Sequence, residues 1–318
     1  SGICLLGVLI FLLYQLVFQS LEIGKRNKKS YAIRCVILAA VILALSANWN
    51  RIADEGVDQW DIASDYKNSG YLYKLACETR YLKVEKIKGY SVDRVKEIAQ
   101  ETETEFEKEN KTYNSEDNVT EKIVTKNVIV IMNESLADFE EFDNLKASEA
   151  ILPGIRSLQE NTKKGYVYVP SFGAGTSDTE YEMLTGNSKQ FLPTGGIAYQ
   201  LYCKNPEYGL ANTFKLEGYS TTAVHPGSEN SWNRSNVYSW MNFDIFYNKE
   251  NWGDNLKYYR WYARDSSAYK RLKMLYKNKE NENQFMFCVT IQNHGGYDPA
   301  NNESFVPDVK LSYDQEYS

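Results

Sequence analysis

The sequence lacks several patterns that would define its chemistry directly. Its five cysteines, Cys4, Cys35, Cys77, Cys203 and Cys288, form no CxxC pair, so neither a zinc ribbon nor a disulfide framework is expected. It has no basic tract longer than a few residues, and its formal net charge is -6. Nucleic-acid binding requires clustered Lys and Arg to neutralise phosphates. Nucleic acid is therefore excluded as the main partner.

Charge is also missing from the start of the chain. Residues 2–21 are twenty residues without a charge, enough for a helix to cross a ~30 Å hydrocarbon layer. A second apolar stretch, residues 31–49, contains only Arg34, near its start, where a long side chain can reach the headgroups. Residues 22–30 carry four basic side chains, which predicts a cytoplasmic turn. We therefore expect residues 1–50 to form a transmembrane hairpin, with the rest of the chain outside the cell.

Two other interpretations of this hairpin stay open: a signal peptide and a buried helical hairpin. A signal peptide carries its basic residues before the apolar run, whereas here they follow it. The chain begins at Ser1 rather than Met, so an upstream portion is expected and the total number of membrane spans stays open. Residues 51–126 are then predicted to form a juxtamembrane helical segment followed by an acidic linker. The linker is expected because the run of alternating Glu and Thr at 101–105 has no apolar side chain to bury.

From Asn127 the pattern changes to short β-branched runs separated by helical stretches, which is typical of an α/β fold with a mostly parallel sheet. Residues 127–318 are therefore expected to form one domain. The predicted strands are 127–133, 165–169, 219–224 and 284–291. The predicted helices are 148–163, 177–186, 207–217 and 265–279. In such sheets ligands bind beyond the carboxyl ends of the strands.

The residues that follow the strands carry the candidate chemistry. Glu134 follows the first strand, and the only two histidines of the chain, His225 and His294, follow the third and fourth. Each histidine alone could be a structural loop cap, but together with an acid they indicate a convergent site. After the second strand, Gly175 allows a tight turn before Thr176 opens a helix.

A threonine hydroxyl at a helix N-terminus has two interpretations. Ser177 and Glu180 match a capping box, so the hydroxyls could serve only to cap the helix. The same position also stabilises an alkoxide and a phosphoryl group. A free Thr hydroxyl is a poor nucleophile, so Thr176 would need a metal held partly by Glu134. Trp232 and Arg234 could then hold the substrate anion.

Four motifs in this order resemble the lipoteichoic acid synthase family, membrane-anchored phosphoglycerol transferases of the sulfatase and alkaline phosphatase superfamily. The motifs are NVIVIMNES, GTSDTEYEM, a His followed seven residues on by WNR, and NHGGY. The resemblance runs to about residue 300 and implies an alkaline phosphatase-like sandwich. It implies that Glu134 and Thr176 are metal ligands and that Thr176 is the nucleophile. It assigns substrate binding to His225, Trp232, Arg234 and His294.

The same resemblance implies a cofactor, partners and a location. The metal is expected to be Mn²⁺, the donor a phosphatidylglycerol-type lipid, and the acceptor a glycerophosphate polymer or a glycolipid. The enzyme would be a multi-pass protein of the cell membrane with an extracellular catalytic domain. One departure concerns the adjacent Asp and His that complete the family's metal site, since this sequence contains no Asp-His dipeptide. We therefore expect a fragment that binds metal poorly and is inactive by itself, ending at 311–318 in the start of a helix.

Several competing functions stay open. An arylsulfatase is disfavoured because Thr176 is not part of a C/S-x-P-x-R sequence. A phosphoethanolamine transferase or another sulfatase-fold hydrolase would share the Thr nucleophile, and only the WNR segment favours glycerophosphate. A non-catalytic envelope protein that binds anionic glycolipid through Trp232 and Arg234 is the alternative from another class.

Overall fold

The chain divides into two compact units. The computed structural model describes residues 11, 14, 28–48, 62–116, 126–171, 175–253, 256–297 and 310–313. The first unit comprises residues 1–99 and 190–196, and the second comprises 100–189 and 197–318. Helix α6 (Val92–Glu116) begins in the first unit and ends in the second.

The first unit is helical. Its elements are α2 (Lys28–Ala47), α4 (Ile62–Ser69), α5 (Tyr71–Glu78) and the 3-10 helix η1 (Thr79–Leu82), with η3 (Lys189–Phe191) at its boundary. Segment 190–196 packs against η1, because Arg80 Nη2 donates to the carbonyl of Thr194 at 3.3 Å and the Tyr81 ring lies against Gly195. Lys74 is buried and forms a 3.0 Å ion pair with Asp65.

The predicted membrane hairpin is only partly covered by the structure. Its second span corresponds to α2, while of its first span only Phe11 and Tyr14 lie within the described residues. Over the described part of the chain, no helix is both long and apolar enough to cross a membrane. The transmembrane hairpin is therefore not confirmed.

The acidic run is helical rather than an irregular linker. Residues 101–105 lie in the middle of α6, and their side chains are exposed. Glu, Gln and Lys have high intrinsic helix propensity, so a segment that buries nothing can still be helical. The side chains of this run are exposed to solvent, as expected. The boundaries of the regions 1–50, 51–126 and 127–318 stay predictions.

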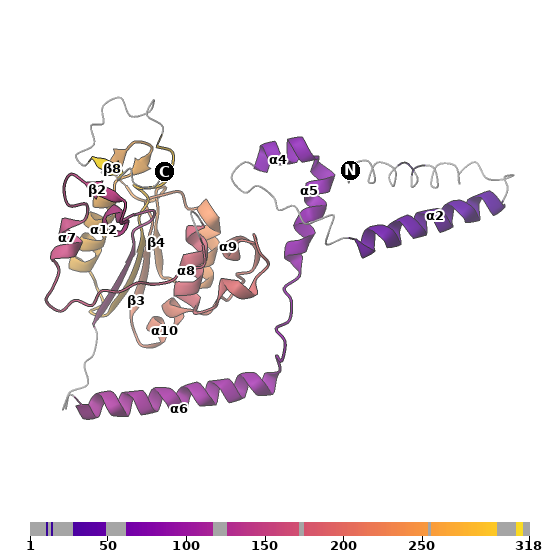
Figure 1. The fold of residues 1–318 in the computed structure, drawn as a ribbon. Helices are drawn as coiled ribbons and strands as arrows, with labels where there is room; N and C mark the ends of the chain where they lie inside the picture. Colours follow the sequence, from indigo (N-terminus) through magenta and orange to yellow (C-terminus); the bar gives the residue numbers. More distant parts are fainter. Residues whose placement is uncertain are drawn as a thin grey trace. The chain divides into compact units, whose positions relative to one another are not determined.

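The second unit is built on a four-stranded parallel sheet (Figure 1). Its order is β1 (Asn127–Met132), β7 (Gln284–Val289), β3 (Ser220–Val224) and β4 (Ile245–Tyr247). Strand β7 is buried along its whole length, as an uninterrupted apolar run predicts for a central parallel strand. Because all four strands are parallel, their carboxyl ends meet at one edge of the sheet. The predicted α/β fold with a parallel sheet is confirmed.

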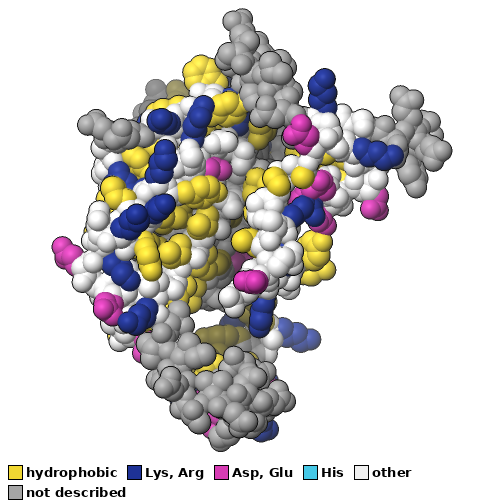
Figure 2. All heavy atoms as spheres, turned by 90° about the vertical axis from the view of Figure 1, so that its left-hand side faces the viewer, with side chains coloured by type: hydrophobic (Ala, Val, Ile, Leu, Met, Phe, Trp, Pro, Cys, Tyr) yellow, Lys and Arg dark blue, Asp and Glu magenta, His cyan; other side chains and the backbone are white. Residues whose placement is uncertain are grey.

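Helices cover both faces of this sheet (Figure 1). Met286 and Cys288 pack with Leu272 of α12 (Asp265–Lys277) on one face. Phe285 points to the other face, where its ring stacks on Phe214 of α10 (Leu210–Leu216) with the ring centroids 4.4 Å apart. This alternation follows from the two-residue period of a strand. Figure 2 turns the α12 side to the viewer, where Lys and Arg side chains are interspersed with apolar ones.

The remaining elements of the second unit are short. They are η2 (Phe139–Glu141), β2 (Leu145–Ala147), α7 (Pro153–Ser157), α8 (Thr176–Thr185), α9 (Ala198–Leu201), η4 (Ser231–Asn233), α11 (Arg234–Trp240), β5 (Tyr258–Tyr259), β6 (Tyr262–Ala263) and β8 (Leu311–Tyr313). Strand β8 pairs antiparallel with β2, and β5 pairs antiparallel with β6.

Three local predictions were wrong. Residues 165–169 form no strand, and Tyr168 is 99% exposed; strand propensity is realised only against neighbours, and this segment joins no sheet in the described part of the chain. The helix predicted at 148–163 is reduced to α7, since Pro153 starts it and Leu158 already adopts an extended backbone. Leu311–Tyr313 form β8 where a helix start was expected.

Candidate active site

Glu134 lies just beyond the carboxyl end of β1. The backbone between β1 and β7 continues to pair, because Thr290 N–H donates to the carbonyl of Met132 at 3.0 Å and Glu134 N–H donates to Thr290 Oγ1 at 3.2 Å. The Glu134 side chain is buried. Burial raises the pKa of its carboxyl group, and the hydrogen bond from Thr176 opposes part of that shift. A carboxylate is thereby held rigidly at the edge of the sheet.

Thr176 is the first residue of α8 and points at Glu134. Its hydroxyl donates to Glu134 Oε1 at 2.8 Å, across 42 positions of sequence. The preceding Gly175 has φ 79°, and a Cβ there would lie 3.0 Å from Ser171 Oγ. Only glycine adopts this backbone without strain, so Gly175 sets the direction in which Thr176 enters the helix.

The capping-box interpretation of α8 is wrong. The N-cap residue is Gly175, which has no side chain, and no side-chain cap hydrogen bond forms. Ser177 Oγ is buried and has no hydrogen-bond partner within the described residues. The Glu180 carboxylate turns away from the helix start and pairs with Arg234. The hydroxyl of Thr176 is therefore free of a capping role.

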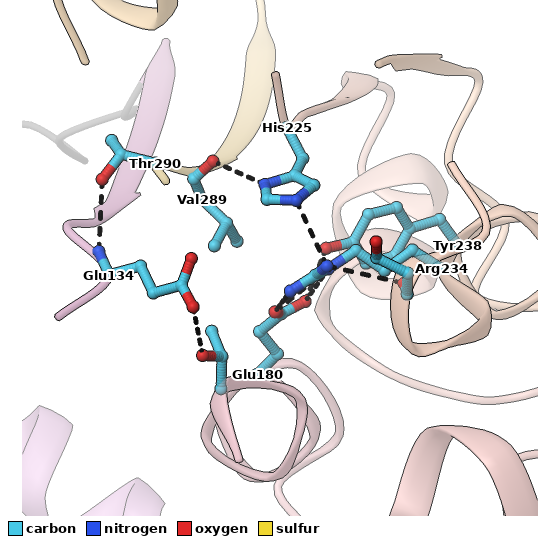
Figure 3. A network of polar contacts seen from close by, with 9 residues as sticks. Glu134, Glu180, His225, Arg234, Tyr238, Val289 and Thr290 are labelled. Carbon is cyan, nitrogen blue, oxygen red and sulfur yellow. Dashed lines mark hydrogen bonds and ion pairs between the residues drawn. The ribbon is translucent and has the colours of Figure 1, made fainter. Parts of the chain in front are cut away.

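A buried charged network lies behind this pair (Figure 3). Arg234 Nε and Nη2 both contact the Glu180 carboxylate, with the shortest distance 2.5 Å from Nη2 to Oε1. The hydroxyl of Tyr238 donates to Glu180 Oε2 at 2.6 Å. Burial lowers the pKa of Arg234, but the Glu180 charge outweighs it and keeps this pKa above its ordinary value. Arg234 therefore keeps its charge inside the protein, next to the Glu180 carboxylate.

His225 joins the network through both ring nitrogens. Its Nδ1 lies 3.0 Å from the Val289 carbonyl, and its Nε2 lies 3.3 Å from Arg234 Nη1. A carbonyl only accepts and a guanidinium only donates, so the neutral ring with the proton on Nδ1 satisfies both contacts. Burial and the Arg234 charge hold the pKa of His225 well below its usual range. His225 is therefore neutral.

Trp232 and His294 complete the set of predicted site residues. Trp232 is half-buried in η4, with φ 58°, two positions before Arg234. His294 lies in the loop after β7 and is half-buried, and its ring packs on the Tyr262 ring at 4.9 Å. Because β7 lies beside β1 in the sheet, the His294 loop follows the same carboxyl edge at which Glu134 lies.

The structure thus brings the predicted residues together in two groups. Glu134 and Thr176 are in direct contact, and His225 and Arg234 are in direct contact. Trp232 lies two positions before Arg234 in the chain, and His294 lies in the loop after β7. The roles of all six residues as ligands, nucleophile and substrate contacts stay predictions.

Three participants were missed from the sequence: Glu180, Tyr238 and Thr290. Glu180 follows Thr176 by four residues on α8, and Tyr238 follows Arg234 by four on α11. Positions i and i+4 share one face of a helix, so this spacing was the available signal. Thr290 has no such signal, because its partner Glu134 lies 156 positions away.

Glu134 Oε1 and Thr176 Oγ1 are oxygen donors 2.8 Å apart, which suits part of the ligand set of a hard cation. Within the residues that the structure describes, no group of three or more His, Cys, Asp or Glu side chains is placed to hold a metal ion. The two donors therefore fit part of a metal site.

Comparison with known proteins defines the family. Residues 126–316 match the Sulfatase family model. The chain therefore belongs to the Sulfatase family, and the matched residues comprise the parallel sheet and the site at its edge. The superfamily inferred from the four motifs is confirmed.

Two curated relatives and one solved structure are informative. The chain is 33% identical over 239 residues to a Rhizobium meliloti (strain 1021) protein named for cyclic beta-1,2-glucan modification, covering 75% of this chain and 34% of that protein. It is 31% identical over 179 residues to the lipoteichoic acid synthase of Staphylococcus saprophyticus, covering 53% and 26%. This chain therefore spans about a third or less of the length of these relatives.

The solved structure is the Streptococcus pyogenes phosphoglycerol transferase GacH in complex with sn-glycerol-1-phosphate. Its similarity to this chain has a TM-score of 0.58 at 22% identity and covers 73% of this chain and 59% of GacH. This similarity establishes a common fold.

Proposed function

We propose that the complete protein is a phosphoglycerol transferase that uses Thr176 as its nucleophile. The observation that carries this proposal is the 2.8 Å hydrogen bond from the Thr176 hydroxyl to the buried Glu134 carboxylate at the start of α8. The first N–H groups of a helix and its dipole favour an anion at this position. The name of the Staphylococcus saprophyticus relative and the GacH fold support glycerophosphate as the group transferred.

The reaction takes place in two displacements. Thr176 Oγ attacks the phosphorus of a phosphatidylglycerol-type donor, the bond from phosphorus to the diacylglycerol oxygen breaks, and that oxygen takes up a proton. A hydroxyl of the acceptor then attacks the same phosphorus and gives up its proton, the bond from phosphorus to Thr176 Oγ breaks, and Thr176 Oγ is protonated again. Glu134 Oε1, which already accepts the Thr176 hydrogen bond, is placed to hold the proton that leaves the hydroxyl.

A divalent ion, proposed to be Mn²⁺, would be held partly by Glu134 and Thr176 and would supply Lewis-acid chemistry that lowers the pKa of the hydroxyl. Glu134 keeps its carboxylate oriented through the Thr290 hydrogen bond, which fixes the backbone at its own position. Such supporting contacts keep a ligand in place before the ion binds.

Arg234 is proposed to hold the phosphate with only one part of its guanidinium. The Nε and Nη2 atoms are engaged by Glu180, whereas Nη1 makes its contacts to His225 Nε2 and the Ser231 carbonyl at 3.3 and 3.5 Å. These are the longest hydrogen bonds of Arg234, so they are the ones a phosphate oxygen would replace. His225 and His294 would line the phosphate, and Trp232 the glycerol.

The acceptor and the location complete the proposal. A relative named for glucan modification supports a carbohydrate hydroxyl, as in a glycolipid, beside the glycerophosphate polymer of the synthase relative. Helix α2 supports membrane anchoring, because its Ile33, Val36 and Leu43 side chains are 60, 68 and 69% exposed and need an apolar environment. The catalytic unit would then lie on the extracellular side.

The proposal is tested with the complete protein and a phosphatidylglycerol labelled in one acyl chain. Wild-type protein with Mn²⁺ should release labelled diacylglycerol, and Glu134→Gln should lose this activity while its folding is retained. Loss of activity with a chelator and its return with Mn²⁺ are expected for the metal. Unchanged turnover in Glu134→Gln with the chelator present would rule the proposal out.

A further inference from the structure

Arg260 adopts a backbone conformation that an arginine normally avoids. It lies in the turn between β5 and β6 with φ 54°. Non-glycine residues in this left-handed region are uncommon and carry strain. A strained arginine in a two-residue turn is retained only where its side chain makes compensating contacts.

Those contacts are made to the loop that carries His294. Arg260 Nη2 donates to the carbonyls of Gln292 at 2.7 Å and His294 at 3.1 Å, and Nη1 donates to the carbonyl of Gly296 at 3.4 Å. The guanidinium carbon also lies 4.1 Å from the centre of the Tyr297 ring. One planar cation therefore binds three main-chain oxygens and one aromatic ring of the same short loop.

The same hairpin also contacts the His294 side chain. The ring centroid of Tyr262, two residues after Arg260, lies 4.9 Å from that of the His294 imidazole. A second clamp follows in Asp265, the first residue of α12, which exchanges two 3.1 Å hydrogen bonds with Gln292. The hairpin and the start of α12 therefore fix both the backbone and the ring of His294.

We propose that Arg260 is a positioning residue that sets His294 against the phosphoglycerol group. This inference rests on the proposed function for the role of His294. Lysine cannot replace Arg260 fully, because a single ammonium lacks the planar fork that reaches three carbonyls at once. Arg260 acts on the reaction through the backbone of the loop and does not contact the substrate.

The placement is tested first without any activity measurement. Hydrogen exchange of the peptide spanning residues 291–297 is measured by mass spectrometry in the complete protein, comparing wild type with Arg260→Met and Arg260→Lys. Arg264→Met is the matched control, because Arg264 Nε donates to the Tyr258 carbonyl within the hairpin. Faster exchange in Arg260→Met, a smaller effect in Arg260→Lys and none in the control are expected. Unchanged exchange in both Arg260 variants would overturn the proposal.

The second test couples Arg260 to His294. Arg260→Met should lower kcat/KM for the labelled donor by about tenfold to a hundredfold, as small misplacements of a binding group do. In a His294→Ala background the same substitution should cause no further loss, since the group it positions is gone. An equal loss in both backgrounds would overturn the positioning role. Faster exchange in Arg260→Met without transfer by the wild type would leave the placement standing and refute the proposed function.

Discussion

The Glu180 and Arg234 side chains are 0 and 2% exposed, so each neutralises a charge that water cannot reach. Removing one member of a buried ion pair leaves the other charge uncompensated. We expect Glu180→Gln to lower the free energy of unfolding by about 3–5 kcal/mol. Urea denaturation measures this loss. The exposed Glu217→Gln is the control and should change stability by less than about 0.5 kcal/mol. Equal effects of the two substitutions would show that the pair is not an important source of stability.

His225 links stability to pH. Because its pKa is lowered by burial and by Arg234, the folded protein keeps this ring neutral while the unfolded chain takes up a proton below about pH 6.5. Stability from His225 is therefore present above that pH and is lost as the pH falls, by up to about 1.4 kcal/mol per pH unit. The raised pKa of Glu134 acts in the opposite direction.

The contribution of His225 is isolated by difference. The free energy of unfolding of wild type and His225→Gln is measured between pH 7.5 and 5.5, in the same buffer series. The wild type should lose more stability on acidification than the variant, because only the wild type contains His225. The contribution of Glu134 is the same in both proteins and cancels in the difference. Parallel pH profiles would mean that His225 is already protonated or equally accessible in the folded state.

Among the secondary-structure elements, sequence patterns located α8 and three of the four strands of the sheet to within two residues but missed α11 and β4. The prediction of α8 was within one residue of the structure, since Gly186 ends the helix in a left-handed conformation. The strand predicted at 165–169 failed because aromatic and β-branched residues favour strands only where a partner strand is present. The end of a helix such as α8 is set by residues next to it in the sequence, whereas a strand forms only where a partner strand from a distant part of the chain is present.

The candidate site was only partly predictable from the sequence. Glu134 and Thr176 were both expected at the carboxyl edge of the sheet, but the strand predicted before Thr176 does not form, so only the position of Glu134 follows from that reasoning. The partnership of Glu180 with Arg234 could not be predicted, because the two lie 54 positions apart and the local sequence offered a capping box as a simpler explanation. Buried ion pairs between elements depend on packing that one sequence does not reveal.

The turn after β3 is under a tight packing constraint. A Cβ at Gly227 would lie 2.4 Å from His225 Nε2, the atom that faces Arg234. Gly227→Ala should therefore displace the imidazole and reduce transfer at least tenfold, with a loss of about 1–3 kcal/mol in stability from overpacking. Gly154→Ala is the matched control, because its Cβ would meet no atom within 4 Å. Full activity in Gly227→Ala would mean that His225 can move without consequence.

At the scale of the whole molecule, the proposed topology places residues after 50 outside the cell. Burial raises the pKa of both Cys203 and Cys288 to about 12, so the folded second unit has no reactive thiol at these positions. An added cysteine at the exposed Ser239 should react with a membrane-impermeant maleimide in intact cells. A cysteine at Ser30 should react only after the cells are broken. The reverse pattern would refute the extracellular location.

The central claim is that Thr176 forms a covalent bond to the transferred group. The complete protein is incubated with Mn²⁺ and phosphatidylglycerol without acceptor, quenched in acid, and its peptides are sequenced by mass spectrometry. We expect glycerophosphate on Thr176, none on the neighbouring buried Ser177, and neither modification nor turnover in a folded Thr176→Ala variant. Modification at Ser177, or wild-type turnover in Thr176→Ala, would contradict it.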